Sequence, residues 1–288
     1  MSREGQSAAK PIRNDWKVQR LTLSMLSLSD SSYLKGACLG DGCLRKVSGT
    51  TALLQITHSA KQKEYLQWKA DRLNKIFKSS NEVKPREIVL SGKTHEACQW
   101  WSPSSEVLLP LWKELYPDGR KRFSPLFLRE IGLEGLALLY MDDGNLHIRK
   151  RGQNKQGELM IRERTVELAL YVPHDIAVMI GDWIECLTGA SFIPRIPMSR
   201  KSPDKWNLRT GGTEARRFVD SLKPFACKAM AYKFDLHYDS SSNRGKAKWS
   251  EADREKYLFE ADKVTRARST QTDNAVGDDI VLSLPPLR

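Results

Sequence analysis

The chain has 288 residues, which is long enough to bury a substantial core and to form one or two domains. Its 47 lysines and arginines against 35 aspartates and glutamates give a net charge of +12 and a pI near 9.5. Such a balance favours a polyanionic partner, although charge alone leaves open a soluble basic protein with no such partner. No apolar run is long enough to span a bilayer, so we expect no membrane partner.

The five cysteines are odd in number and contain no Cys-x-x-Cys pair. This pattern argues against a disulfide framework or a zinc ribbon and favours a reducing compartment, with an organelle and the bacterial cytoplasm left open. Residues 1–30 are polar and basic, and we predict a flexible N-terminal arm there. An organellar transit segment is the alternative.

The first half of the chain predicts helices and strands in turn. A helix is expected at Leu34–Gly42, and a strand follows over residues 52–58. The remaining elements expected in this half are a helix over 61–77, strands over 88–90 and 97–101, and a helix over 107–116.

The second half repeats this order. A helix at Leu136–Gly144 precedes a basic hairpin over residues 147–164 and a strand over 166–172. The elements that follow are a helix over 176–187, strands over 195–198 and 205–209, and a helix over 214–222. Residues 240–288 predict a charged extension, partly disordered, with an exposed helix over 248–264.

The stretch Leu136–Gly144 begins with six apolar residues and ends in Asp142, Asp143 and Gly144. A carboxylate is unfavourable at a helix C-terminus, where the dipole is negative, and a bound hard cation would offset that cost. Gly144 is expected to end the helix with a positive φ. A hairpin turn without a metal is the alternative for Asp-Asp-Gly-Asn.

The same pattern occurs at Leu34–Gly42, which also ends in Asp-Gly. Asp41 and Asp143 occupy equivalent positions in the two copies, about one hundred residues apart, which is the length of a subdomain.

Both nonamers resemble the LAGLIDADG signature of homing endonucleases. The resemblance implies an α+β fold, a pseudo-twofold pair of αββαββα subdomains whose antiparallel sheets form a DNA-binding saddle. The pattern requires one further strand in the first half, near Arg45–Val47. The subdomains implied are residues 31–128 and 129–239, between the arm at 1–30 and the extension at 240–288.

The resemblance implies that the two motif helices pack side by side and bring Asp41 and Asp143 together. Two such carboxylates would repel, so a shared site requires a cation, and two or three Mg²⁺ ions are expected at the subdomain interface. Gly40 and Asp142 are further candidates for metal contacts through backbone or water. Leu138 occupies the place of the signature glycine, so close helix packing is expected from Ala137 against Gly36 or Gly40.

Relatives also place a basic residue near the metal from the end of each half. The matching positions are Lys121 or Arg122 in the first half and Lys233 in the second. Such a cation could steady the attacking water or the transition-state charge. An ordinary phosphate contact is the alternative for each of them.

DNA contacts are expected from the strands, because a twisted antiparallel ribbon fits the major groove. Most of these side chains should contact phosphates only. The candidates are Arg45, Lys46, Gln55, Lys93, Arg149, Lys150, Arg151, Arg162, Arg164, Arg195, Arg200, Lys201, Lys205 and Arg209.

The function implied is that of an intron-encoded, site-specific DNA endonuclease. It would act as a monomer on double-stranded DNA and make a magnesium-dependent double-strand break in a long asymmetric site. The alternatives are an intron maturase, which binds intron RNA and assists splicing, and a transcription regulator that has kept the fold. Because both Asp41 and Asp143 are present, the sequence favours the endonuclease over these two alternatives.

Overall fold

The computed structural model describes residues 26–153, 159–197 and 204–236. The predicted N-terminal arm up to residue 25 and the C-terminal extension from residue 237, with its expected helix, lie outside these residues. The chain divides into two units. The first contains Gly42–Arg122, and the second contains Ser31–Asp41 and everything from Phe123 onwards. The subdomain boundaries expected from the sequence stay a prediction.

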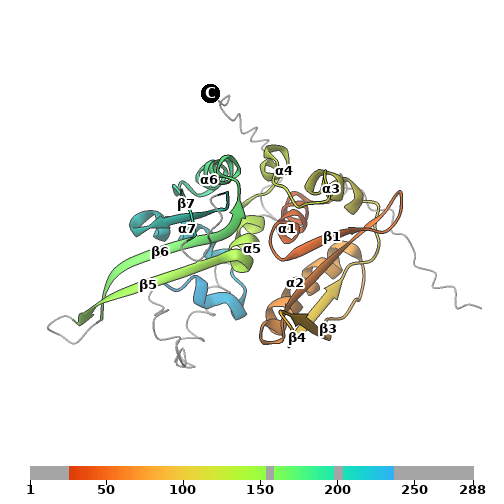
Figure 1. Cartoon of the computed structure of the whole chain (residues 1–288), viewed down its shortest axis with the longest axis horizontal. Coiled ribbons are helices and arrows are strands. Elements are labelled where there is room, and N and C mark those ends of the chain that lie inside the picture. Colours follow the sequence, from red (N-terminus) through yellow and green to blue (C-terminus); the bar gives the residue numbers. More distant parts are fainter. Residues whose placement is uncertain (1–25, 154–158, 198–203, 237–288) are drawn as a thin grey trace, which may run out of the picture. The chain divides into compact units, whose positions relative to one another are not determined.

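The first unit is built on a four-stranded antiparallel sheet with the strand order β1-β2-β4-β3 (Figure 1). The strand predicted near Arg45–Val47 is confirmed as β1, which begins three residues earlier. The elements of this unit are β1 (Gly42–Lys46), β2 (Ala52–Ser59), the 3₁₀ turn η2 (Ala60–Gln62), α2 (Lys63–Phe77), β3 (Lys84–Leu90), β4 (Lys93–Trp101) and α3 (Leu108–Leu115).

The second unit contains a sheet of the same design, with the order β5-β6-β8-β7. Its elements are α1 (Leu28–Leu39, from Ser31 on), α4 (Pro125–Arg129), α5 (Leu133–Asp143), β5 (Gly144–Gln153), β6 (Leu159–Val172), α6 (His174–Thr188), β7 (Ile193–Arg195), β8 (Trp206–Gly211), α7 (Gly212–Leu222) and the 3₁₀ turns η3 (Lys223–Phe225) and η4 (Lys228–Lys233). The α+β class predicted from the sequence is therefore confirmed.

Predicted boundaries in this unit are wrong in two places. The strand expected over residues 195–198 is β7, Ile193–Arg195, which begins two residues earlier. The sequence suggested a hairpin over 147–164 and a separate strand over 166–172, but β6 runs without interruption from Leu159 to Val172. The ladder between β5 and β6 has register shifts on both sides of Lys150. Where pairing is irregular, apolar and polar residues alternate less regularly along a strand. The first part of β6 therefore reads in the sequence as a basic hairpin and not as part of a long strand.

In the described part of the chain, the helices α2 and α3 contact the first sheet, and the side chains on its other face are partly exposed, so we call this the open face. Along β2, Leu54 and Ile56 are fully buried, whereas Gln55 and Thr57, which alternate with them, are only half-buried. Side chains alternate between the two faces of a strand, so Leu54 and Ile56 point toward α2 and α3, which contact this sheet. Gln55 and Thr57 mark the open face.

Tyr140 is the centre of the core beneath the second sheet. Its ring meets those of Phe218 and Phe234 edge-on, with centroids 5.1 and 5.2 Å away. Its hydroxyl donates to the carbonyl oxygen of Lys233 over 2.6 Å. Because α5, α7 and η4 all meet at this one side chain, the position of the α5 C-terminus is fixed by the core.

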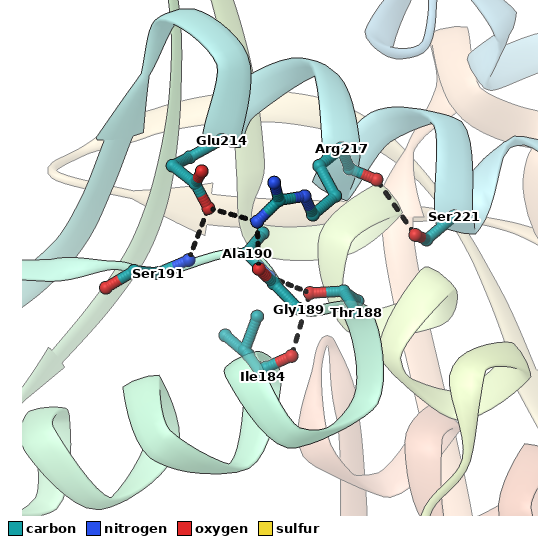
Figure 2. Close-up of polar contacts among 8 residues, drawn as sticks. All are labelled: Ile184, Thr188, Gly189, Ala190, Ser191, Glu214, Arg217 and Ser221. Carbon is teal, nitrogen blue, oxygen red and sulfur yellow. Dashed lines mark hydrogen bonds and ion pairs between the residues drawn. The ribbon is translucent and has the colours of Figure 1, made fainter.

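The turn after α6 is fixed by a side chain of α7, as Figure 2 shows. Gly189 ends α6 with a φ of +67°, a left-handed conformation that favours glycine. Arg217 donates to the carbonyl oxygen of Gly189 over 2.6 Å and pairs with Glu214 at 3.2 Å. Glu214 in turn accepts the backbone N–H of Ser191 over 3.0 Å. These contacts direct the chain from α6 into β7.

Within the part of the chain that the structure describes, no helix combines the length and apolar character needed to cross a membrane.

Candidate metal centre and nucleic-acid interface

The two motif helices, α1 and α5, cross at glycines. A Cβ atom added to Gly36 would lie 2.4 Å from the Cα of Gly135, and one added to Gly135 would lie 2.5 Å from the carbonyl oxygen of Ser32. The Ser32 hydroxyl also accepts the backbone N–H of Gly132 over 2.9 Å. Only glycine allows two helix backbones to approach this closely.

This crossing corrects the expectation that Ala137 faces Gly36 or Gly40. Gly36 meets Gly135, and Gly40 meets Asp142. Gly135 lies one helical turn before Leu138, the residue that replaces the signature glycine. The contact has moved one turn toward the start of α5. A glycine just outside the nonamer was the sequence signal that could have revealed it.

Beyond the crossing, the two motifs bring carboxylates together. The backbone N–H of Asp41 donates to Oδ2 of Asp142 over 2.9 Å. Carboxylate oxygens of these two residues lie within 4.8 Å of each other. A Cβ on Gly40 would lie 2.1 Å from the same Asp142 oxygen. Three of the predicted metal-site residues, Gly40, Asp41 and Asp142, therefore meet at one point.

Asp143 is the last residue of α5 and is half-buried. Gly144 opens β5 just as Gly42 opens β1, so Asp143 and Asp41 hold equivalent positions in the two repeats. Gly144 does not take the expected positive φ, because its φ is −85° in an extended conformation. Glycine is required at this position for another reason: a Cβ atom here would lie 2.0 Å from the ring of Tyr140.

This end of the two helices has the chemistry of a hard-cation site. The carboxylates of Asp41 and Asp142 are oxygen ligands of the kind that Mg²⁺ and Ca²⁺ prefer. Asp41 is exposed and Asp142 is half-buried, so solvent has access to the pair. Two carboxylates this close repel each other, and a bound cation removes that cost.

Lys233 is buried against the end of α5. Its ammonium donates to the carbonyl oxygens of Met141, at 2.5 Å, and of Asp142, at 3.5 Å. These carbonyls lack partners within the helix, and a cation near a helix C-terminus is also favoured by the dipole. The contacts that the structure gives Lys233 thus hold the backbone next to the acids.

The two basic candidates in the first unit differ from each other. The Lys121 ammonium donates over 2.8 Å to the carbonyl oxygen of Gly42, the residue that follows Asp41. Arg122 is exposed and pairs with Asp118, and this contact holds the pKa of the Asp118 carboxyl below its usual value. Lys121, like Lys233, therefore contacts backbone at the end of a motif.

The DNA-contact candidates of the first sheet lie on both of its faces. Gln55 is on the open face, as is Arg45, whose guanidinium lies 5.4 Å from the centre of the Trp101 ring. Lys93 opens β4 and is exposed. Lys46 instead lies over the ring of Trp112, next to α3 on the helix-covered side, at 5.6 Å.

In the second sheet, Arg164 donates to the carbonyl oxygen of Leu236 over 2.9 Å, and Arg209 pairs with Glu163 at 3.5 Å. Arg195 on β7 and Lys205 just before β8 are exposed. Four candidates lie in β5 and β6, but their side chains are outside the described part of the molecule: Arg149, Lys150, Arg151 and Arg162. Arg200 and Lys201 lie outside the described residues altogether.

Comparison with known proteins shows which families and proteins this chain is similar to. Residues 31–172 match the model of the LAGLIDADG DNA endonuclease family. The RecA protein of Mycobacterium gastri is 34% identical over 235 residues, which cover 80% of this chain and 52% of that protein. The RecA protein of Mycobacterium shimoidei is 32% identical over 218 residues, 72% of this chain and 47% of that protein. The chain thus spans about half the length of these curated relatives.

Among solved structures, the homing endonuclease I-WcaI bound to its DNA recognition sequence has the same fold. Its TM-score is 0.61 at 17% identity, with 81% of this chain and 96% of that chain covered. The repeated sheets and the glycine-crossed helices that end in adjacent acids define an α+β protein with a duplicated helix-end carboxylate site. This chain belongs to the LAGLIDADG DNA endonuclease family.

Proposed function

We propose that this chain is a site-specific DNA endonuclease that cuts both strands of a long duplex site with the help of a divalent cation. The observation that carries the proposal is the meeting of Asp41 with Asp142 where the two motif helices end. A single chain supplies both motifs, so we infer that it acts as a monomer.

Within this proposal, Asp41 and Asp142 hold the cation. Asp143 is a further ligand, because it occupies in the second repeat the position that Asp41 occupies in the first. A bound Mg²⁺ supplies charge for the phosphate and lowers the pKa of a water molecule. Lys121 and Lys233 fix the backbone beside the acids through the carbonyl oxygens that they contact. Held in this way, the carboxylates need little rearrangement when a phosphate enters.

Double-stranded DNA is the partner that we infer. I-WcaI, which shares the fold, is bound to its DNA recognition sequence. In this chain the first sheet leaves one face open and polar, with Arg45 and Gln55 on it. The charge of +12 favours association with a polyanion at any sequence, whereas contacts to base edges would set the site.

The test is cleavage of a randomised duplex library in magnesium buffer, followed by cleavage of the selected duplex by variants. Asp41→Asn and Asp143→Asn should each lose double-strand cleavage by at least about 100-fold, because a neutral amide binds a hard cation poorly. Binding in the absence of metal, measured by mobility shift, should remain within a few-fold.

Asp204→Asn is the matched control, because Asp204 is exposed and lies before β8. It should cleave like the wild type. Chelation should stop cleavage and added Mg²⁺ should restore it. Wild-type cleavage by Asp41→Asn would contradict the proposal.

A further inference from the structure

The open face of the first sheet carries a row of polar side chains across three strands. Thr57 on β2 pairs with Gln99 on β4, and Gln99 pairs on its other side with Lys84 on β3. Residues directly opposite each other in an antiparallel ladder share a face, and Arg86 follows Lys84 by two residues on that same face. Lys84, Arg86, Thr57 and Gln99 therefore form one polar surface.

Hydrogen bonds fix this surface in one arrangement. Arg86 Nη1 donates to Gln99 Oε1 over 2.6 Å, and Gln99 Nε2 donates to Thr57 Oγ1 over 2.7 Å. A guanidinium can only donate, so the Gln99 atom that it contacts must be the carbonyl oxygen. The amide nitrogen of Gln99 must then face Thr57. Since Gln99 is only 6% exposed, it cannot easily release Arg86.

The guanidinium of Arg86 keeps free donors. It has five N–H groups, and among the described residues only Gln99 is its partner. Arg86 is exposed and lines an open hollow of about 580 Å³. Lys84, Gln99 and Trp101 line the same hollow. An ordered, planar set of donors thus faces a space that a ligand can enter.

We propose that Arg86 is a specificity-determining residue that reads a guanine, with Gln99 as the positioning residue that holds it. This inference rests on the proposed function. Guanine offers two acceptors, O6 and N7, along its major-groove edge, and a guanidinium matches both at once. A phosphate contact needs no such tether, because a mobile lysine can also bind phosphate as a point charge without a fixed plane. The bond to Gln99 fixes the plane of the guanidinium, which is the property that base reading requires.

The test compares the base preferences of the wild type and variants in the same randomised duplex library. Wild type should require guanine at one position. Arg86→Lys keeps the charge but loses the planar fork, so it should lose this preference by about tenfold or more. Its preferences elsewhere and the salt dependence of binding should stay unchanged. Gln99→Met removes the acceptor at similar volume and should weaken preference at that same position.

Lys93→Ala is the matched control, since Lys93 is an exposed cation on the same face of β4. It should lower affinity for all sequences alike. An unchanged guanine preference in Arg86→Lys, or a uniform loss of affinity, would assign Arg86 to a phosphate and overturn the inference while leaving the proposed function intact. A wild type that selects no duplex at all would overturn both. Thermal unfolding of each variant verifies that it is folded.

Discussion

Asp142 combines two properties in one side chain. Its Oδ2 accepts the backbone N–H of Asp41, which ties the end of α1 to α5. Its charge also lies within 4.8 Å of the Asp41 carboxylate. The first property is geometric and the second is electrostatic, and only the second requires a cation. Two substitutions at this one position separate them.

Asp142→Asn keeps a side-chain carbonyl oxygen as the acceptor for Asp41 but removes the charge. We expect its free energy of unfolding to stay within about 0.5 kcal/mol of wild type, while the magnesium concentration needed for cleavage rises about tenfold or more. Asp142→Ala should also lose about 1 kcal/mol of stability, because the acceptor is gone. Urea unfolding and magnesium titration of the cleavage rate measure the two effects. Wild-type magnesium dependence in Asp142→Asn would limit Asp142 to holding the backbone.

At the scale of the helix pair, the glycine contact decides whether α1 and α5 can approach. Gly36→Ala adds a methyl group 2.4 Å from the Cα of Gly135, and backbone cannot move aside as a flexible side chain can. Alanine improves helix propensity by up to about 1 kcal/mol, so the clash must exceed that gain. We expect a net destabilisation of about 1–3 kcal/mol or more in urea unfolding.

Gly49→Ala is the matched control, because no described atom lies within 4 Å of where its Cβ would be. Its stability should change by less than about 0.5 kcal/mol. If Gly36→Ala unfolded at the same urea concentration as the wild type, the close crossing of α1 and α5 would be contradicted.

The sequence predicted the helices and strands wherever apolar residues follow a clear period. The strand β2 and the helix α6 are examples. The motif helices were predicted from the duplicated apolar stretches, and β1 from the family pattern. Prediction was weaker where partners are distant in the chain. Lys35 lies inside the first motif and is 2% exposed, yet it pairs with Glu130 and lies 5.2 Å from the centre of the Phe127 ring. A buried lysine cannot be foreseen from its neighbours alone.

The same reason explains the limits at the candidate site. The duplication at subdomain spacing identified Asp41 and Asp143, because it is a property of the sequence itself. The crossing at Gly135 and the contact between Asp41 and Asp142 depend on the position of α1 along α5. A shift of one helical turn changes that position and leaves the motif sequence unchanged. The tether between Arg86 and Gln99 likewise depends on strand register.

At the scale of the whole molecule, the five cysteines are distributed over both units, so their reactivity can be used to follow each unit. All of them are free thiols, with Cys43 and Cys186 exposed. Cys98 is buried in the first unit, and Cys38 and Cys227 are buried in the second. Burial raises the pKa of the Cys98 thiol, which lowers its reactive thiolate fraction at any given pH. The thiols therefore separate into accessible and protected groups.

We expect a thiol reagent at pH 8 to label two cysteines per native chain rapidly and the other three only on unfolding. A Cys43→Ser, Cys186→Ser variant should show no rapid labelling, because the remaining thiols are protected by the cores. Mass spectrometry of labelled peptides across a urea series then follows each unit by its own cysteines. Joint labelling of Cys98, Cys38 and Cys227 would show that the units unfold together, and rapid labelling of any of the three in native protein would contradict the packing described for that unit.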